Sequence, residues 1–394
     1  MTAPTPSVGD QFSSASVQGF PAGVLVLTGR GHVPVERVRP GDVVLTHRNR
    51  WRPVERLIDC GRQSTVRVRG SGHYGLRTTS GRRLYVRGDR RRQAQLTEAC
   101  WRPVSDLATG PDGLDRWATP TNIPALPLPA VARPYPCGRL NHIDRTHLRR
   151  EGFWWLVGLF VAEGSTSSSY GAGGARNRSV WSVHVDVEAK ATAALDALGL
   201  NCYRWQAPGA KVAQVVVSSA TLTSFLVELA GHGAAGKRLH PGVFGLPGPC
   251  RAALFDGALT GDGYQRAQSF TYTTVSRALA FDMRLLALSL GQQASVQFRR
   301  TADTRVIRGR TVRCRDLYKV QGCPRPSKPR FRWAHDMAWG RVLGVAADGQ
   351  APCYDLDVAD DASYVVEGLV VHGGERRSEL RERAVAVMPT ARGT

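Results

Sequence analysis

Two patterns of hydrophobic and polar positions alternate along the chain. From about residue 24 to residue 87, short apolar runs such as VLVLT and STVRVRG are separated by turns rich in Gly and Pro, which predicts an all-β module. Residues 118–136 are rich in proline and predict an extended linker. Strand-like alternation returns in CYDLDVADDASYVVEGLVVHG at 353–373. The β pattern is therefore interrupted rather than ended.

The interrupting segment contains the same succession of elements twice. EGFWWLVGLFVAEG at 151–164 is an apolar helical segment that ends in an acid and Gly, and it is followed by strand-like WSVHVDV and helical ATAALDALG. Further along, CRAALFDGALTGDG at 250–263 is followed by strand-like SFTYTTV and helical ALAFDMRLLALSLG. This repetition predicts a duplicated α/β module inserted into a β domain.

Charge narrows the class of partner. The 394 residues include 53 Lys and Arg against 32 Asp and Glu, a net charge of +21, which favours nucleic acid. No run of 18 apolar residues and no secretory signal pattern occur, so we expect neither a membrane span nor secretion. The eight cysteines are scattered without a CxxC pair, which favours a reducing cytoplasm, of bacterial or phage type.

Arginine is clustered as well as abundant. Only five of the 53 basic residues are Lys, a bias that a GC-rich genome would explain, but codon usage does not explain clustering. Arg residues two apart on a strand share one face, and an Arg-bearing β-ribbon fits a DNA major groove; a solvated basic hairpin is the alternative. The predicted DNA-binding residues are Arg299, Arg300, Arg305, Arg308, Arg310, Arg313 and Arg315, with Arg82 and Arg83 from the cluster at 82–92.

The two apolar helical segments carry the candidate chemistry. Residues 156–164 read LVGLFVAEG and residues 255–263 read FDGALTGDG, with small residues four apart on one face. If these faces pack together, Glu163 and Asp262 meet at the same end and repel each other unless a cation such as Mg²⁺ lies between them. Beside a DNA backbone, this arrangement would cleave a phosphodiester. The alternative is close packing with two ordinary surface acids.

These paired segments resemble the signatures of LAGLIDADG homing endonucleases with two motifs in one chain, over roughly 150–330. The resemblance implies two αββαββα halves that form a saddle over double-stranded DNA, and a monomer. It implies that Glu163 and Asp262 are catalytic and bind Mg²⁺, with two or more ions expected. KRLHP resembles the family's K-x-[IL]-P context with one extra residue. Lys237 is therefore the predicted catalytic lysine, which would orient the attacking water or stabilise charge. Lys319 and Lys328 are candidates for its counterpart.

The flanking β segments resemble the Hint fold of inteins, over about 19–120 and 340–373. The start, GFPAGVLVLT, has Gly19 where the first nucleophile belongs, and Gly supplies neither thiol nor hydroxyl. Thr79 matches a Thr-x-x-His element, but Arg82 stands at its His position. His372 is kept, yet Gly373 and Gly374 replace the Asn and the final nucleophile, and Ala362 replaces a further His. The resemblance therefore implies an intein-like domain that has lost splicing.

Together these features predict a multidomain protein, an all-β Hint fold interrupted by a duplicated α/β endonuclease domain. The predicted function is a site-specific, metal-dependent DNA endonuclease; an inactive DNA-binding relic and an intein with residual splicing are the alternatives. The predicted segments are a tail at 1–18, the first β part at 19–145, the endonuclease at 146–330, the second β part at 331–374 and a tail at 375–394.

Overall fold

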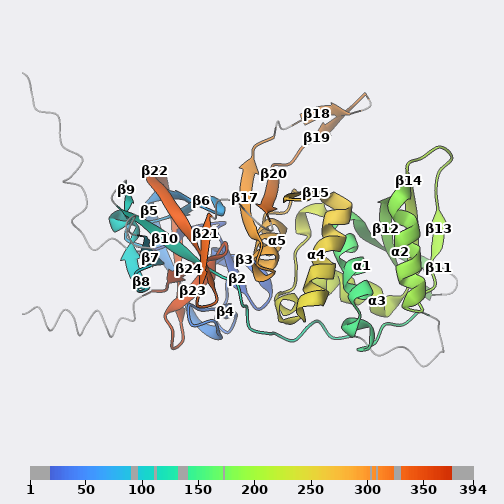
Figure 1. Cartoon of the computed structure of the whole chain (residues 1–394), viewed down its shortest axis with the longest axis horizontal. Helices are drawn as coiled ribbons and strands as arrows, with labels where there is room; N and C mark the ends of the chain where they lie inside the picture. The colour runs from blue at the N-terminus through green and yellow to red at the C-terminus, as the bar shows by residue number, and fades with distance from the viewer. Residues whose placement is uncertain are drawn as a thin grey trace, which may run out of the picture.

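The computed structural model describes residues 18–89, 96–110, 113–131, 141–171, 174–301, 304–307, 309–323 and 330–374. Figure 1 shows a β domain, in blue, teal and red, beside an α/β module in green and yellow. No helix among these residues is long and apolar enough to cross a membrane.

The β domain combines strands from both ends of the described chain. Its N-terminal part supplies β1 (Phe20–Pro21), β2 (Leu25–Thr28), β3 (Gly31–Pro34), β4 (Val43–Leu45), β5 (Trp51–Gly70), β6 (His73–Thr78), β7 (Arg83–Asp89), β8 (Cys100–Pro103), β9 (Thr109–Gly110) and β10 (Gly113–Pro120), with 3-10 turns at Val35–Arg37 and Val104–Asp106. Its C-terminal part supplies β21 (Phe331–Ala334), β22 (Met337–Val358), β23 (Ser363–Val366) and β24 (Leu369–His372).

Long-range pairing explains how this domain tolerates an interruption. The main sheet runs in the order β1-β22-β10-β7-β24-β23-β2-β4-β5-β6. Buried aliphatic residues lie at the joins between the two parts, with Val26 opposite Val366 and Leu84 opposite Val371. β10 pairs antiparallel with β22, so the chain leaves the sheet and returns to it at neighbouring positions. The intervening module therefore emerges from one place on the sheet.

The first half of this module has the predicted αββαββα order. It consists of α1 (Glu151–Glu163), β11 (Gly164–Gly171), β12 (Gly174–His184), α2 (Val185–Ala197), β13 (Tyr203–Trp205), β14 (Val212–Ser218) and α3 (Ala220–Ala230), after a 3-10 turn at His147–Arg149. The expectation that WSVHVDV is one strand is wrong, because β12 ends at His184. The His184 side chain accepts a hydrogen bond from the Asp186 backbone N–H and caps α2.

The second half departs from that order at its end. It contains α4 (Gly248–Asp262), β15 (Gly263–Arg266), β16 (Ser269–Thr274), α5 (Arg277–Ser289), β17 (Gln293–Arg299) and β20 (Leu317–Cys323), and a hairpin of β18 (Thr304–Ile307) and β19 (Arg310–Arg313) precedes β20. Turns at Ala234–Gly236 and Pro241–Gly245 join the halves. In the described part of this half, no third helix follows β20. Each half forms a four-stranded sheet, ordered β11-β12-β14-β13 and β15-β16-β20-β17.

Helices α1 and α4 pack backbone against backbone between these sheets (Figure 1). A Cβ atom added at Gly158 would lie 2.0 Å from the Leu254 carbonyl oxygen, and one at Gly257 would lie 2.0 Å from the Trp155 carbonyl oxygen. Separations below 3.0 Å essentially never occur for real Cβ atoms. The predicted packing of these helices through small residues is therefore confirmed.

Helix α5 joins the module to the β domain. Residues 279–288 are all buried, because α5 lies between the β17–β20 sheet on one side and β3 on the other (Figure 1). A helix that is buried on every face belongs to the interior of a larger body. One apolar core accordingly includes Leu27 of β2, Leu285 of α5 and Trp339 of β22.

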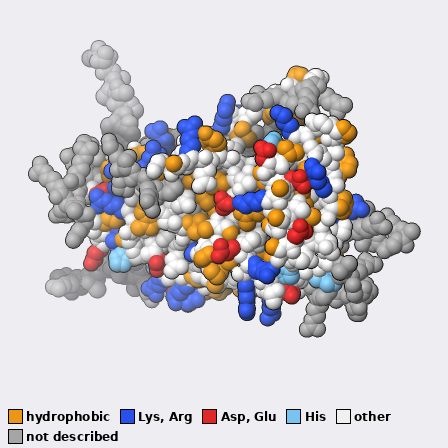
Figure 2. Space-filling view, turned by 45° about the vertical axis from the view of Figure 1, so that its right-hand side comes forward, with side chains coloured by type: hydrophobic (Ala, Val, Ile, Leu, Met, Phe, Trp, Pro, Cys, Tyr) orange, Lys and Arg blue, Asp and Glu red, His pale blue; other side chains and the backbone are white. Residues whose placement is uncertain are grey.

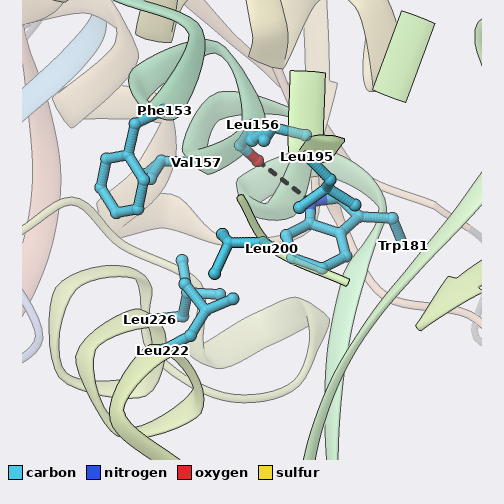
Figure 3. A pocket seen from close by; sticks show the side chains of 8 residues that line it. All are labelled: Phe153, Leu156, Val157, Trp181, Leu195, Leu200, Leu222 and Leu226. Atoms are coloured by element: carbon cyan, nitrogen blue, oxygen red, sulfur yellow. Dashed lines mark hydrogen bonds between the residues drawn. The ribbon is translucent and has the colours of Figure 1, made fainter. Parts of the chain in front are cut away.

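A small apolar gap lies in the core of the first half, lined by side chains from α1, α2, α3 and β12 (Figure 3). Its volume is about 10 Å³, no more than one water molecule needs. At its edge the indole N–H of Trp181 donates to the Leu156 carbonyl at 3.0 Å, which ties β12 to α1. This gap is a packing defect and offers no ligand site.

We expect Gly257→Ala to lower the free energy of unfolding by about 1–3 kcal/mol, because the new methyl group forces α1 and α4 apart. Gly152→Ala is the matched control, since it adds the same methyl group to α1 where no atom lies within 4 Å. Urea unfolding followed by circular dichroism measures both changes. Equal effects of the two substitutions would contradict the close contact.

Candidate functional site

Glu163 and Asp262 are the last residues of α1 and α4, and the helix contact brings them together. A Cβ atom at Gly261, beside Asp262, would lie 2.8 Å from Glu163 Cγ. Each acid is followed directly by glycine and then by a strand. Side chains at Gly164 and Gly263 would meet Phe160 at 2.1 Å and Leu259 at 2.5 Å, so only glycine fits where each chain turns from helix to strand.

Their surroundings disfavour the charged form of both carboxyl groups. Burial raises the pKa of Glu163. Part of Asp262 is exposed to solvent, but protein atoms surround the rest of it. This partial burial, together with the charge of Glu163, raises the pKa of Asp262 to about 6. Lys237 offsets part of this shift. Two neighbouring carboxyl groups with raised pKa values form a site that a cation would stabilise.

The donor set fits a divalent cation of the magnesium type. Mg²⁺ is commonly bound by one or two carboxylates, with water and substrate phosphates completing its shell. In the part of the chain that the structure describes, no group of three or more His, Cys, Asp and Glu side chains is arranged for a metal ion. Glu163 and Asp262 are therefore the candidate ligands, and they suit a metal shared with a phosphate.

Lys237 lies at the same helix ends. Its ammonium group donates to the Phe160 carbonyl at 2.7 Å and lies 3.9 Å from the centre of the Phe160 ring. The residue is only 5% exposed, and burial lowers its pKa to about 8, partly offset by Asp262. Of its proposed counterparts, Lys319 is half-buried in β20 opposite Thr273 and Gln297. Lys328 lies outside the described residues.

The Arg-rich hairpin projects from the module. β18 and β19 form a two-stranded antiparallel ribbon beyond β17 and β20 (Figure 1). Arg299, Arg300, Arg313 and Arg315 are exposed; Arg308 and the side chains of Arg305 and Arg310 lie outside the described residues.

The expectation that Arg residues two apart share one strand face does not hold for Arg313 and Arg315. Gly309, with φ +76°, turns the chain just before β19, and β19 ends at Arg313. Arg315 therefore lies beyond the end of that strand, and Arg308 lies outside the described residues.

Basic side chains lie on both rims of the molecule, including the side from which the hairpin projects (Figure 2). In Figure 2, Lys and Arg side chains line the upper rim of the molecule, and others lie along the lower rim. β15 follows Asp262 directly and lies on the upper side in Figure 1, so the two acids end near the same side. This placement would let an extended polyanion pass over the acids.

Arg82 is not available for such a contact, which corrects its expected role in DNA binding. Its side chain is fully buried, is paired with Asp355 at 2.8 Å, stacks on Phe20 at 4.8 Å and donates to the His372 carbonyl. A buried arginine with these partners cannot reach a phosphate. Arg83 begins β7 and is half-buried.

The residues at the predicted splicing positions surround the buried Arg82–Asp355 pair. The Gly19 N–H donates to Thr79 Oγ1 at 3.1 Å, and a Cβ at Gly19 would lie 3.0 Å from Cys353 Cβ. The Gly374 N–H donates to the Leu356 carbonyl at 2.9 Å.

A further hydrogen bond joins two of these positions: the Gly373 N–H donates to the carbonyl of Ala362, which has φ +44°. The structure thus brings residues 19, 79, 82, 362 and 372–374 into one place.

Sequence reasoning missed the other polar residues of this region. His47 Nδ1 lies 2.7 Å from Ser363 Oγ, and Trp101 lies edge-on to both His47 and His372. His372 makes its own close contact with the Gly373 carbonyl at 2.7 Å. Asp355 was detectable as an acid inside the apolar alternation of YDLDV, whereas no local pattern marks His47.

No protein-family model matches the chain. A stretch of 252 residues is 27% identical to the ATP-dependent DNA helicase Hel308 of Thermococcus kodakarensis, covering 55% of this chain and 21% of that protein. A stretch of 129 residues is 33% identical to an iron–sulfur cluster assembly SufBD family protein of Mycobacterium tuberculosis, covering 30% of this chain and 15% of that protein. The chain thus spans about a fifth or less of these relatives' lengths.

Solved structures resemble it distantly. The homing endonuclease I-DmoI in complex with DNA and Ca is 13% identical, with a TM-score of 0.32, over 45% of this chain and 84% of that one. The Ssp DnaB mini-intein variant M86 is 7% identical, with a TM-score of 0.32, over 92% of this chain and 97% of that one. At these scores, a function has to be argued from the chain's own geometry.

We expect Arg82→Met to lower the free energy of unfolding by about 3–5 kcal/mol, because it leaves the buried Asp355 carboxylate unpaired. Arg30→Met is the matched control, since Arg30 pairs with Asp42 at the surface and its side chain is 53% exposed; its effect should be about 1 kcal/mol or less. Thermal unfolding measures both. If Arg82→Met instead weakened DNA binding without loss of stability, Arg82 would be a DNA contact rather than the partner of a buried carboxylate.

Proposed function

We propose that the chain is a Mg²⁺-dependent, site-specific endonuclease for double-stranded DNA, of the LAGLIDADG type, within an intein-like β domain that no longer splices. The observation that carries this proposal is the meeting of Glu163 and Asp262 at the ends of two helices in backbone contact. Close packing alone does not require an acid at the end of both helices. Because one chain contains both acids, one copy would suffice for cleavage.

Each residue of the site has a distinct task in this proposal. Glu163 and Asp262 would hold two or more divalent ions, which lower the pKa of a bound water and stabilise charge on the leaving oxygen. Lys237 is held at the same helix ends by its bond to the Phe160 carbonyl. Its lowered pKa, about 8, suits it to orient the attacking water or to exchange a proton with it near neutral pH.

Arginine on the hairpin would contact the DNA. The exposed Arg313 ends β19 of the ribbon, and the exposed Arg299, Arg300 and Arg315 lie on or next to β17 and β20, which lead to it. A two-stranded ribbon has the width that a major groove admits. Contacts to phosphates would make binding strongly salt-dependent.

In this proposal the β domain neither cleaves nor forms peptide bonds. Gly19 and Gly374 supply no nucleophile, and Gly373 supplies no carboxamide. The buried Arg82–Asp355 pair fills the centre of the former site. Purified protein should therefore show a single intact mass near 42.9 kDa, whereas ligated or cleaved fragments would support the alternative of residual splicing.

We expect the protein with Mg²⁺ to cut a duplex selected from a randomised library, and Glu163→Gln or Asp262→Asn to lower the single-turnover rate by about 100-fold or more. Glu151→Gln is the matched control, because Glu151 is an exposed acid at the opposite end of α1, and it should leave the rate unchanged. Gel shifts at increasing salt measure DNA binding separately. Binding without any cleavage would instead favour a non-catalytic DNA-binding relic.

The pH profile gives a second readout of the same experiment. A protonated carboxyl group is a poor metal ligand, and the pKa of Asp262 is raised to about 6 in the metal-free protein. The Mg²⁺ concentration for half-maximal cleavage should therefore rise as the pH falls through about 6. A requirement for Mg²⁺ that does not change between pH 7 and pH 5 would exclude Asp262 as a ligand.

A further inference from the structure

The segment that carries Lys237 is held by hydrogen bonds along four consecutive residues. The backbone N–H groups of Arg238 and His240 donate to carbonyls at the end of α3, at 3.0 and 2.8 Å. The Lys237 carbonyl accepts from Ser276 Oγ at 2.6 Å, and the Leu239 N–H donates to Asp282 Oδ2 at 2.8 Å. Two of these four bonds therefore involve α5, through its N-cap Ser276 and through Asp282 within the helix.

Asp282 connects this segment to the β domain. Its other oxygen, Oδ1, lies 2.8 Å from Nδ1 of His32 in β3, and both side chains are completely buried. A carboxylate can only accept hydrogen bonds, so in this pair an ionised Asp282 requires the proton to be on Nδ1 of His32. A buried carboxylate that loses one of two donors is strongly destabilised, which makes the position of Asp282 dependent on His32.

The β domain also touches the segment directly. Gly31 precedes His32 at the turn between β2 and β3, and a Cβ there would lie 3.6 Å from Arg238 Cδ and 3.7 Å from the Leu239 carbonyl oxygen. The ring of His32 packs against Phe281 of α5 with their centres 6.0 Å apart. The loop that presents Lys237 is thus packed against the β2–β3 turn as well as bonded through Asp282.

We propose that His32 is a positioning residue of the nuclease site: through Asp282 it fixes the Lys237 segment, so the β domain is a working part of the cleavage machinery. This inference rests on the proposed endonuclease function. Lys237 reaches the helix ends only if its backbone stays in place, and a displacement of about 1 Å at a catalytic group lowers a rate by about 100-fold. The β domain would then be needed for DNA cleavage even though it lacks the residues for splicing.

The same domain boundary offers a matched control. His73 Nε2 lies 2.8 Å from Glu367 Oε2, and these side chains are 0% and 1% exposed, as buried as His32 and Asp282. The remaining partners of Glu367 are Arg277 and the Leu25 N–H. Among the hydrogen bonds and ion pairs of the described residues, none joins His73 or Glu367 directly to residues 237–240. Breaking it removes a similar interaction without touching the Lys237 segment.

The test compares His32→Ala, His32→Asn and His73→Ala in the full chain. We expect His32→Ala to lower the single-turnover cleavage rate by about 10- to 100-fold at saturating DNA, with little change in the Kd for DNA, because position rather than binding is lost. Asn places an amide donor close to that of Nδ1, so His32→Asn should recover most of the rate. His73→Ala should lower the melting temperature as much as His32→Ala and leave the rate near wild type.

A second measurement separates this inference from the proposed function. Acetylation of Lys237 by acetic anhydride, followed by mass spectrometry without DNA or metal, reports how well the 5%-exposed side chain is held. We expect several-fold faster labelling in His32→Ala than in His73→Ala or wild type. If the wild type does not cleave DNA, the endonuclease proposal fails while this labelling difference still tests the positioning. Equal labelling of both Ala variants, or equal loss of cleavage in both, would overturn the inference.

Discussion

The contact between α1 and α4 leaves no room for a side chain at Gly158 or Gly257, because the carbonyl oxygens of Leu254 and Trp155 occupy that space. This restriction fixes the axial position of one helix against the other. Because α1 ends at Glu163 and α4 at Asp262, it also places the two acids at the same level. The two four-stranded sheets then start at the next residue of each chain segment, Gly164 and Gly263. The contact between α1 and α4 therefore positions both the two acids and the first strand of each sheet.

The fold of the β domain does not depend on the residues at the predicted splicing positions. Its sheet is held by buried aliphatic pairs between strands far apart in sequence, such as Val26 with Val366, and none of these pairs depends on residues 19, 373 or 374. Around the predicted splicing positions lie the buried Arg82–Asp355 pair and several backbone hydrogen bonds. Meanwhile α5 buries its whole circumference between this domain and the α/β module, so that the two share one core.

Much of this architecture could be predicted from local sequence patterns. The interrupted β pattern, the repeated apolar helices and their packing through Gly158 and Gly257 follow from periodicity and small-residue spacing. The end of β12 was misplaced because His184 caps α2, a choice between two local hydrogen-bonding patterns that alternation does not reveal. Arg82 was misassigned because a cluster of charges suggests a surface, whereas Asp355, 273 residues away, provides a buried partner. His32 and Asp282 were missed for the same reason, since their link spans 250 residues.

The central claim is that two helix ends in contact form one metal-dependent nuclease site. The most direct test is to incubate the intact protein with a selected DNA duplex, with and without Mg²⁺, and to map the new ends on both strands. We predict a break in both strands that requires Mg²⁺ and is lost in both Glu163→Gln and Asp262→Asn while DNA binding remains. Cleavage that survives the loss of either acid, or a bound duplex that stays intact with the wild type, would contradict it.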